Sequence, residues 1–250
     1  MKHAELHEVF DSVQGEGPWI GQRQIFVRFA GCNIRCGYCD TLDSVQLQEK
    51  THPQACNIQI KAGSKERELA TNPISSQILT MFCKRLIIPG PSRPVISLTG
   101  GEPLLQASFL MEWLPTVKNE FTLYLETNGI YHSDMMMIRD LVDIVSMDFK
   151  LPSSTGLRPF WDDHTKFLDS ISGKTLFIKV VVTRETKVDD ILTACNIITL
   201  FDRSTLLVMQ PASGPFAPES GMLMDFQQTA LMILANVRII PQAHKILNVP

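Results

Sequence analysis

Short apolar runs and longer amphipathic stretches alternate along most of the chain. The short runs are rich in β-branched residues and predict strands at about 24–30, 94–99, 121–126, 142–147, 175–182, 205–210 and 237–240. The amphipathic stretches predict helices near 75–88, 103–118, 134–141, 187–200 and 222–235. Such an alternation is typical of a parallel sheet with right-handed crossovers. We therefore expect an α/β fold, either a doubly wound sheet or a partial (β/α) barrel of about six parallel strands.

Three segments lack this rhythm. Residues 43–73 are polar and charged without clear periodicity, and we expect a surface insertion there, with His52 and Cys56 as ordinary loop residues. Residues 152–166 and 211–220 also read as loops. No repeat or linker divides the chain, so we expect one domain over residues 1–250 that carries the 43–73 insertion.

Composition narrows the classes of protein that are possible. Of the 250 residues, 44% are hydrophobic and 20% are charged, which is typical of a globular domain. The net charge of -3 argues against a general nucleic-acid binder. No apolar run reaches the roughly 18 residues that a membrane helix needs, and no apolar stretch follows the first lysine as in a signal peptide. We expect a cytoplasmic protein with no membrane partner, in which the six cysteines are not a disulfide framework.

Three of the cysteines form the most specific pattern in the chain. Cys32, Cys36 and Cys39 follow the first predicted strand with the spacing C-x3-C-x2-C. A structural zinc site usually has a fourth protein ligand, and none follows at ligand spacing. Three thiolates suit a 4Fe–4S cluster with one iron left open to a small molecule. A zinc-stabilised binding module and a simple electron carrier stay as alternatives, the latter weakened because four cysteines would usually close its cluster.

Polar residues and glycines gather after several predicted strands. They lie at 31–41, 99–103, 126–129, 146–150, 210–213 and 241–244. Parallel α/β folds bind ligands at the carboxyl ends of their strands. We therefore expect these segments to surround one large site.

The chemistry of individual residues suggests what such a site would hold. The paired glycines before Glu102 permit a close backbone approach, and the Glu102 carboxylate can accept from an ammonium group. Arg28 alternates with apolar residues on the first strand, and an arginine that faces a barrel interior needs an anionic partner. Gln14 and Glu16 stand on a glycine-flanked turn, where Gln14 can both donate and accept hydrogen bonds and Glu16 can only accept them.

The cysteine spacing, Tyr38 before the last cysteine, and the sequence Gly100-Gly101-Glu102-Pro103 resemble the radical S-adenosylmethionine (SAM) superfamily. The resemblance implies a partial TIM-like barrel, a 4Fe–4S cluster on Cys32, Cys36 and Cys39, and SAM bound to the open iron. In this family the cofactor carries the radical chemistry, so no protein side chain is expected to be catalytic. The implied SAM-binding residues are Gly101, Glu102, Glu126, Asn128, Ser146, Asp148, Lys150, Gln210, Pro211, Ala212 and Ser213. Some members have a shorter Ser-Pro-Lys where this chain has residues 146–150, which leaves open which side chain touches the SAM sugar.

Within the superfamily, the flanking sequences are most similar to the 7-carboxy-7-deazaguanine synthases of queuosine biosynthesis. The similar pieces are residues 12–17, 26–28, 40–41 and 240–250. The resemblance implies conversion of 6-carboxy-5,6,7,8-tetrahydropterin to 7-carboxy-7-deazaguanine with loss of ammonia, an electron donor such as flavodoxin, and a homodimer. It implies substrate binding by Val13, Gln14, Gly15, Glu16, Arg28, Thr99, His244 and Pro250, and Mg2+ binding by Thr41. A small glycyl-radical activating enzyme would share the cysteine motif, and is the rival closest in mechanism.

Overall fold

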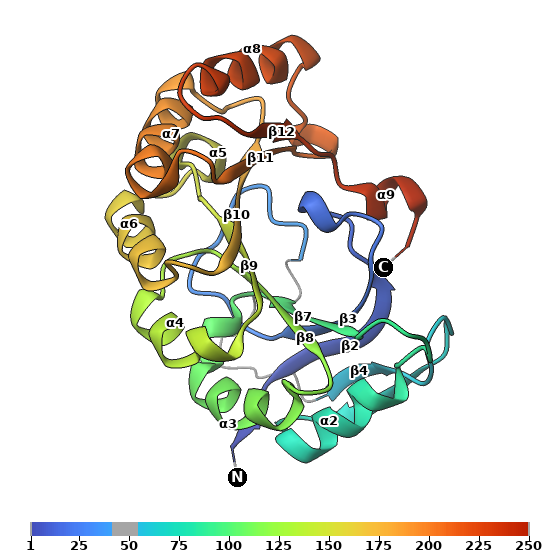
Figure 1. Ribbon diagram of the computed structural model, residues 1–250. Coiled ribbons are helices and arrows are strands. Elements are labelled where there is room, and N and C mark those ends of the chain that lie inside the picture. Colours follow the sequence, from blue (N-terminus) through green and yellow to red (C-terminus); the bar gives the residue numbers. More distant parts are fainter. Residues whose placement is uncertain (1, 42–54, 250) are drawn as a thin grey trace.

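A computed structural model describes residues 2–41 and 55–249. Its main feature is a ten-stranded sheet with the order β12-β11-β10-β9-β8-β7-β3-β2-β4-β5. The run from β3 to β12 pairs in parallel throughout and comprises β3 (Arg23–Phe29), β7 (Val95–Gly100), β8 (Thr122–Thr127), β9 (Ile144–Asp148), β10 (Thr175–Val182), β11 (Leu206–Pro211) and β12 (Val237–Ile239). The sheet curves into an open barrel (Figure 1). All seven predicted strands are present, and the predicted partial barrel is confirmed.

Helices cover the convex side of this sheet (Figure 1). The five expected helices correspond to α2 (Ser76–Arg85), α3 (Ala107–Val117), α4 (His132–Ile138), α7 (Val188–Asp202) and α8 (Ser220–Leu231). Short 3-10 turns, η3 (Pro103–Gln106) and η4 (Arg139–Leu141), precede α3 and follow α4. The main hydrophobic core lies between these helices and the outward-facing residues of the strands, and Trp113 and Leu110 of α3 are completely buried in it. Among the described residues, no helix is both long and apolar enough to span a membrane.

The strand β2 (Leu6–Val13) is missing from the sequence-based prediction. It runs antiparallel to β3 and continues the sheet beyond it. The 3-10 turn η1 (Gly17–Trp19) follows and places the Trp19 ring 5.7 Å from Phe177 and 5.8 Å from Tyr124, inside the barrel. Gly17 has a φ of +64°, and a Cβ there would meet the Phe177 ring at 2.4 Å. A side chain at this position would therefore displace η1 and Trp19 from the barrel interior.

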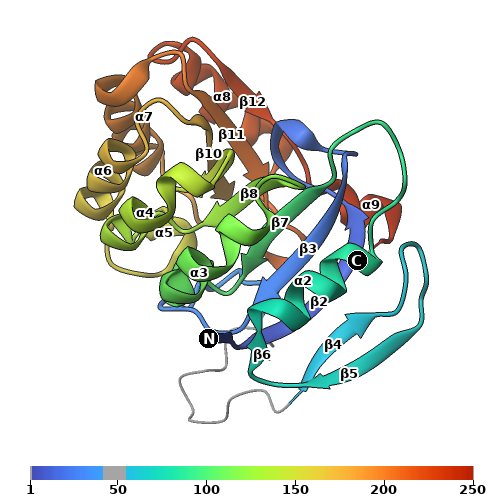
Figure 2. The same cartoon turned by 60° about the horizontal axis from the view of Figure 1, so that its bottom comes forward.

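The expected irregular insertion at 43–73 is wrong for its second half. Residues from 55 onward form a hairpin of β4 (Ala55–Gln59) and β5 (Arg67–Thr71) that pairs with β2 at the edge of the sheet (Figure 2). Asp11 of β2 links the hairpin to the rest of the sheet. Its carboxylate accepts from Arg23 of β3 and, at 2.9 Å, from the backbone amide of Gly63 in the turn between β4 and β5. Cys56 lies on β4 and is completely buried, so it is not a loop thiol. The part of the insertion at 43–54, with His52, lies outside the described residues.

The expectation of a loop at 152–166 is also wrong. Two helices lie there, α5 (Pro152–Thr155) and the start of α6 (Trp161–Ser170). His164 of α6 is completely buried and stacks on Phe149, with ring centroids 4.5 Å apart. The polar composition of this segment therefore does not show that one face of α6 packs against the core. The segment at 211–220 is largely a loop around the short turn η5 (Gly214–Phe216). A final helix, α9 (Ala243–Leu247), and a small sheet of β1 (His3–Ala4) with β6 (Ile74–Ser75) complete the fold.

Candidate active site

Parallel register places one polar residue from each successive strand on the concave side of the sheet. Arg28 of β3 is level with Thr99 of β7. Across the barrel, Asp148 of β9 is level with Lys179 of β10. Residues that are level in neighbouring strands point to the same face of the sheet, so strand ends far apart in the sequence contribute to one polar interior.

These residues line one cavity of about 400 Å³ at the carboxyl ends of the strands. Pockets for small ligands commonly have about this size. Most of the predicted site residues border it: Val13, Gln14, Gly15, Glu16, Arg28, Cys32, Cys36, Cys39, Thr41, Thr99, Gly101, Glu126, Asn128, Asp148, Lys150, Gln210, Ala212, Ser213 and His244. Glu102, Ser146 and Pro211 do not border it, and Pro250 lies outside the described residues.

The cysteine loop forms one wall of this cavity. Cys32, Cys36 and Cys39 are all partly buried and free of disulfides. Burial raises the pKa of Cys32 to about 11 and raises that of Cys36. No three His, Cys, Asp or Glu side chains of the described residues form a site for a single metal ion. Three thiols on one loop, facing one cavity, are a donor set that fits an iron–sulfur cluster with an open iron.

The paired glycines hold the cysteine loop against the barrel. The Glu102 amide donates to the Gly31 carbonyl at 2.7 Å, and a Cβ on Gly101 would lie only 1.8 Å from that carbonyl oxygen. At the other end of the loop, the Gly37 amide donates to the Thr155 carbonyl at 3.1 Å. The close approach at Gly101 therefore sets the position of the first cysteine ligand.

Glu102 lies beneath the cavity, where its carboxylate is completely buried. It accepts hydrogen bonds from the Asn128 amide at 2.7 Å, the Thr127 hydroxyl at 2.9 Å and the Leu104 amide at 3.1 Å. Burial raises its pKa to about 7 despite these donors. Its expected contact with an ammonium group stays a prediction, and in the described structure it joins β8 to the turn that follows β7.

This buried carboxyl makes a testable contribution to stability. An unfolded Glu102 has a pKa near 4.5 and the folded one near 7, so folding is favoured at low pH. The advantage is lost as the pH rises from 4.5 to 7, and amounts to a loss on the order of 3 kcal/mol. We expect the stability of the cofactor-free protein, minus that of Glu102→Gln, to fall by this amount across that range in urea unfolding.

The comparison with Glu102→Gln is needed because His164 acts in the opposite direction. Burial lowers the pKa of His164 to about 3, so its contribution to stability is lost as the pH falls below 6.5. The two effects offset one another in the unmodified protein, whereas subtracting the variant isolates Glu102. A difference that stays constant from pH 4.5 to pH 7 would contradict the assignment.

A cluster of four charged side chains crosses the cavity. The Lys179 ammonium contacts the Glu16 carboxylate and lies 3.3 Å from Asp148, which in turn accepts from Lys150 at 2.6 Å. Burial opposes ionisation, but Lys179 and the Gln242 amide hold the pKa of Glu16 below its usual value. Burial likewise opposes ionisation of Asp148, while the two lysines lower its pKa. Both carboxylates therefore stay charged inside the barrel.

Lys179 is a site residue that sequence reasoning missed. It lies within the apolar strand TLFIKVVV and is only 7% exposed. A lone lysine among β-branched residues on an inward-facing position was the available signal, because such a charge needs a buried partner. The pattern of apolar residues predicted the strand, but it did not by itself identify Lys179 as a site residue.

Glu126, for which the resemblance implies a contact with SAM, contacts two residues of the predicted substrate side. Its carboxylate accepts from the Thr99 hydroxyl at 2.7 Å and from the Gln14 amide at 2.9 Å. The Gln14 side-chain Oε1 accepts from the Glu16 backbone amide at 3.0 Å. The Gln14 side chain thus already has protein partners, and its role in reading a ligand stays a prediction.

The last helix closes the cavity from the other end of the chain. His244 packs directly against Gly15, where a Cβ would lie 2.1 Å from the His244 Nδ1. The Gln242 amide donates to Glu16 at 2.8 Å and to Asp40 at 3.0 Å. Lys245 also pairs with Asp40, at 2.9 Å. The prediction that His244 reaches the site near Gln14–Glu16 is consistent with this placement, whereas Gln242 and Lys245 were not anticipated.

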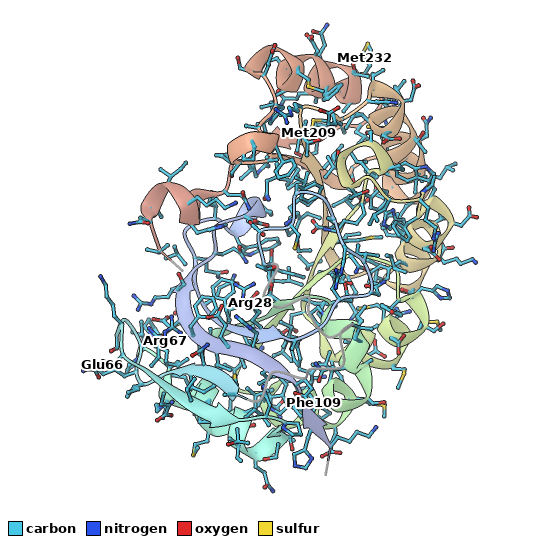
Figure 3. The ribbon with its side chains drawn as sticks, turned by 180° about the vertical axis from the view of Figure 1, so that it is seen from behind. Arg28, Glu66, Arg67, Phe109, Met209 and Met232 are labelled. Carbon is cyan, nitrogen blue, oxygen red and sulfur yellow. The ribbon has the colours of Figure 1, made fainter. Side chains whose placement is uncertain are left out.

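Arg28 lies on the concave side of the curved sheet, while Phe109 of α3 lies on the opposite side (Figure 3). Its Nε donates to Glu8 of β2 at 2.8 Å, and its guanidinium lies 5.6 Å from the Phe10 ring. Among the described residues, Glu8 is the only acidic partner of this arginine. Glu8 is therefore the anionic partner that an inward arginine requires, and it too was not anticipated.

One atom of the cavity wall lacks a partner. The Gln210 amide nitrogen donates to Glu16 at 3.0 Å, but its Oε1 is buried without a hydrogen bond among the described residues. Buried polar atoms are rarely left unsatisfied. A bound molecule with an N–H or O–H group would satisfy this oxygen, which fits the cavity as a ligand site.

The half-open barrel with a three-cysteine loop at its rim defines an iron–sulfur enzyme of the radical SAM class. Residues 13–150 match the family described as "4Fe-4S single cluster domain". The chain belongs to the 7-carboxy-7-deazaguanine synthase family. It is 40% identical to the 7-carboxy-7-deazaguanine synthase of Geobacter sulfurreducens, over 98% of this chain and 97% of that protein. It is 33% identical to the synthase of Methanopyrus kandleri, over 97% of this chain and 93% of that protein.

Solved structures share the fold. The crystal structure of QueE from Escherichia coli matches with a TM-score of 0.59 and 19% identity, over 96% of this chain and 94% of that one. Streptococcus suis SuiB bound to S-adenosylmethionine matches with a TM-score of 0.51 and 13% identity, over 86% of this chain and 48% of that one. The fold of the chain is therefore that of radical SAM enzymes.

Proposed function

We propose that this enzyme converts 6-carboxy-5,6,7,8-tetrahydropterin to 7-carboxy-7-deazaguanine, with loss of ammonia, as a step of queuosine biosynthesis. The observation that carries the proposal is the single cavity that brings the three-cysteine loop together with Glu16, Arg28 and His244. A glycyl-radical activating enzyme acts on a protein backbone and would have no use for this set of small-molecule ligands. The glycyl-radical activating enzyme is accordingly not favoured.

The substrate side of the site would use charge to read the pterin. Glu16 is held ionised by Lys179, so it can accept from the ring N–H and amino group of a guanine-like edge. Arg28 keeps its Nη groups available beyond the Glu8 contact, and these would bind the substrate carboxylate. His244 would complete this side, and Pro250 would add its terminal carboxylate.

The cofactor side lies beside the cysteine loop. When bound, the 4Fe–4S cluster and SAM supply the one-electron chemistry that starts the ring contraction. Asn128, which donates to Asn33 at 2.8 Å, and Lys150 would orient SAM beside the cluster. Gln210 and Ala212 border the cavity from β11 and the segment after it, and would line the nucleoside part. The protein groups bind and orient, and the buried strand faces keep water from the reacting atoms.

Thr41 would bind Mg2+ together with the substrate carboxylate and water. Its side chain borders the cavity directly after the last cysteine, and its hydroxyl lies 3.7 Å from the Cys39 sulfur. A single protein hydroxyl is a weak Mg2+ ligand, because the ion requires six oxygens. Mg2+ binding is therefore expected to depend on the substrate.

Four broader properties complete the proposal. The enzyme acts on a small molecule and takes its electron from a protein such as flavodoxin. It works as a homodimer in the cytoplasm. These properties rest on the family resemblance and on the reducing conditions that the three free thiols need.

Anaerobic reconstitution with iron and sulfide, followed by incubation with SAM, a reductant and 6-carboxytetrahydropterin, tests the function. The expected result is an iron- and sulfide-containing protein that forms 7-carboxy-7-deazaguanine. Zinc without iron would instead support a binding module. A loaded cluster that cleaves SAM but leaves the pterin unchanged would point to a different substrate.

Replacing Arg28 tests the substrate side separately. We expect Arg28→Gln to weaken pterin binding about ten- to hundredfold, because a hydrogen bond to a charged group contributes roughly 1.5–3 kcal/mol. Cluster content and SAM binding should be unchanged, since Arg28 is not one of the three thiols and its guanidinium pairs with Glu8 of β2. Equilibrium binding of substrate is the measurement.

Arg23→Gln is the matched control for Arg28→Gln. Arg23 lies on the same strand and pairs with Asp11 at 2.5 Å, but it does not border the cavity. It should leave substrate affinity unchanged. Equal losses in the two variants would remove Arg28 from the proposed binding site.

A further inference from the structure

A second depression lies on the outer side of the cysteine loop. It is formed by apolar and aromatic side chains, Ile34 of the loop, Tyr131 before α4, and Leu157 and Phe160 between α5 and α6. Arg35 and Arg158 stand at its border. Asn33 and Ile34 belong to the cysteine loop, and Ile34 also lines the active-site cavity. The other lining residues do not border that cavity, so the depression is a separate feature.

This depression and the active-site cavity share a lining residue in the cysteine loop. Ile34 borders both, and it is 9% exposed. Its neighbours in the chain, Asn33 and Arg35, fill the stretch between Cys32 and Cys36. A donor protein bound here would therefore lie close to the sulfur atoms of Cys32 and Cys36. This favours electron transfer, because its rate falls steeply with distance.

The charge of this surface is positive where it meets the loop. Arg35 is exposed, and it has neither an ion pair nor a hydrogen bond among the described residues. Arg158 is 67% exposed, with its guanidinium 4.3 Å from the Phe160 ring. Asp163 approaches Arg158 at 3.5 Å, but an exposed pair of this kind is screened and weak. Arg35 is thus the unpaired cation of the surface.

We propose that this surface, with Arg35 and Arg158 at its border and Ile34 in its floor, is the docking site of an acidic electron-donor protein. The inference rests on the cluster of the proposed function. The step transfers one electron from the reduced donor to the oxidised cluster, so the donor is oxidised by one electron, the cluster is reduced by one, and no bond forms or breaks. An apolar floor with a cationic border fits a weak, transient complex steered by charge.

The test compares reduction of the cluster by two donors. Reconstituted protein is mixed anaerobically with reduced flavodoxin, an acidic protein, or with dithionite, and bleaching of the cluster absorbance is followed by stopped flow. We expect Arg35→Glu to slow reduction by flavodoxin at least tenfold at low salt and to weaken its dependence on ionic strength. Reduction by dithionite should be unchanged. No pterin is needed, so failure of this proposal is distinct from failure of the proposed function.

Two further variants keep the result interpretable. If Arg35→Glu lowers the iron content, Arg158→Glu tests the docking site in its place, because Arg158 lies outside the cysteine loop. We then expect Arg158→Glu to slow reduction by flavodoxin. Arg238→Glu, an exposed arginine on β12, is the control and should behave like the unmodified protein. The proposal is overturned if flavodoxin reduces the border variants and the control equally fast. It is also overturned if sedimentation shows that Arg35→Glu separates a dimer, because the surface would then be a subunit contact.

Discussion

Replacing any one of Cys32, Cys36 and Cys39 by alanine should abolish the cluster absorbance and the activity together. The three thiols are the cysteines of the described residues that face the cavity, and no fourth cysteine borders it. A cluster that loses one of three thiolate ligands has two irons without protein ligands, and metal sites of this kind bind cooperatively with their full ligand set. Iron and sulfide analysis after anaerobic reconstitution, with the visible spectrum, gives the measurement.

Cys195→Ala is the matched control for these replacements. Cys195 lies on α7, is completely buried in the core on the convex side of the sheet, and does not border the cavity. The control should retain iron, sulfide and turnover, with a small loss of stability from the vacated volume. Full activity in any one of the three loop variants would refute the assignment of the cluster ligands.

Lys179→Met should destabilise the folded protein by about 3–5 kcal/mol at pH 8, which is the usual cost of leaving buried charges without a partner. Lys179 contacts both Glu16 and Asp148, so its loss leaves Glu16 without its cation and leaves Asp148 with Lys150 alone. The pKa of Glu16 should then rise, because burial would no longer be outweighed. Protonation of Glu16 at pH 5 would relieve part of the cost. Urea unfolding at the two pH values measures the difference.

Two companion variants separate this effect from a general loss of charge. Lys166→Met removes an exposed lysine from α6 and should change stability by a few tenths of a kcal/mol at most. Glu16→Gln combined with Lys179→Met should recover much of the stability, since the stranded carboxylate is gone. The prediction is contradicted if Lys179→Met lowers the free energy of unfolding by less than about 1 kcal/mol, equally at both pH values. Lys179 would then not stabilise the charges of Glu16 and Asp148.

The parallel part of the barrel could be predicted from the sequence because its strands are buried on both sides and read as continuous apolar runs. Residues 175–182 are such a run. The strand Leu6–Val13 escaped notice because its polar and apolar residues come in pairs, as in HEVFDS, and do not alternate one by one. Its inward Glu8 and its carboxylate at Asp11 are explained only by Arg28 and Arg23 on the neighbouring strand.

The site could be predicted in its motifs but not in its pairings. Spacing alone identified the cysteines and the paired glycines, because those positions lie close together in the chain. The contact of Glu16 with Lys179 joins residues 163 positions apart, and the choice of partner depends on strand register. The same holds for the hydrogen bonds that Glu126 accepts from Thr99 and Gln14. No local pattern records such contacts.

Glu16 also meets Gln242, at a separation of 226 positions, and Asp40 meets Lys245. The earliest and latest parts of the polypeptide therefore share one wall. During synthesis, the barrel strands can form before the C-terminal residues of that wall are in place. Bringing the two ends of the chain together also carries the entropic cost of closing a long loop. A ribosome must release residue 245 before the pocket can shut, so a nascent chain stalled earlier would expose its thiols to oxygen and stray metal ions.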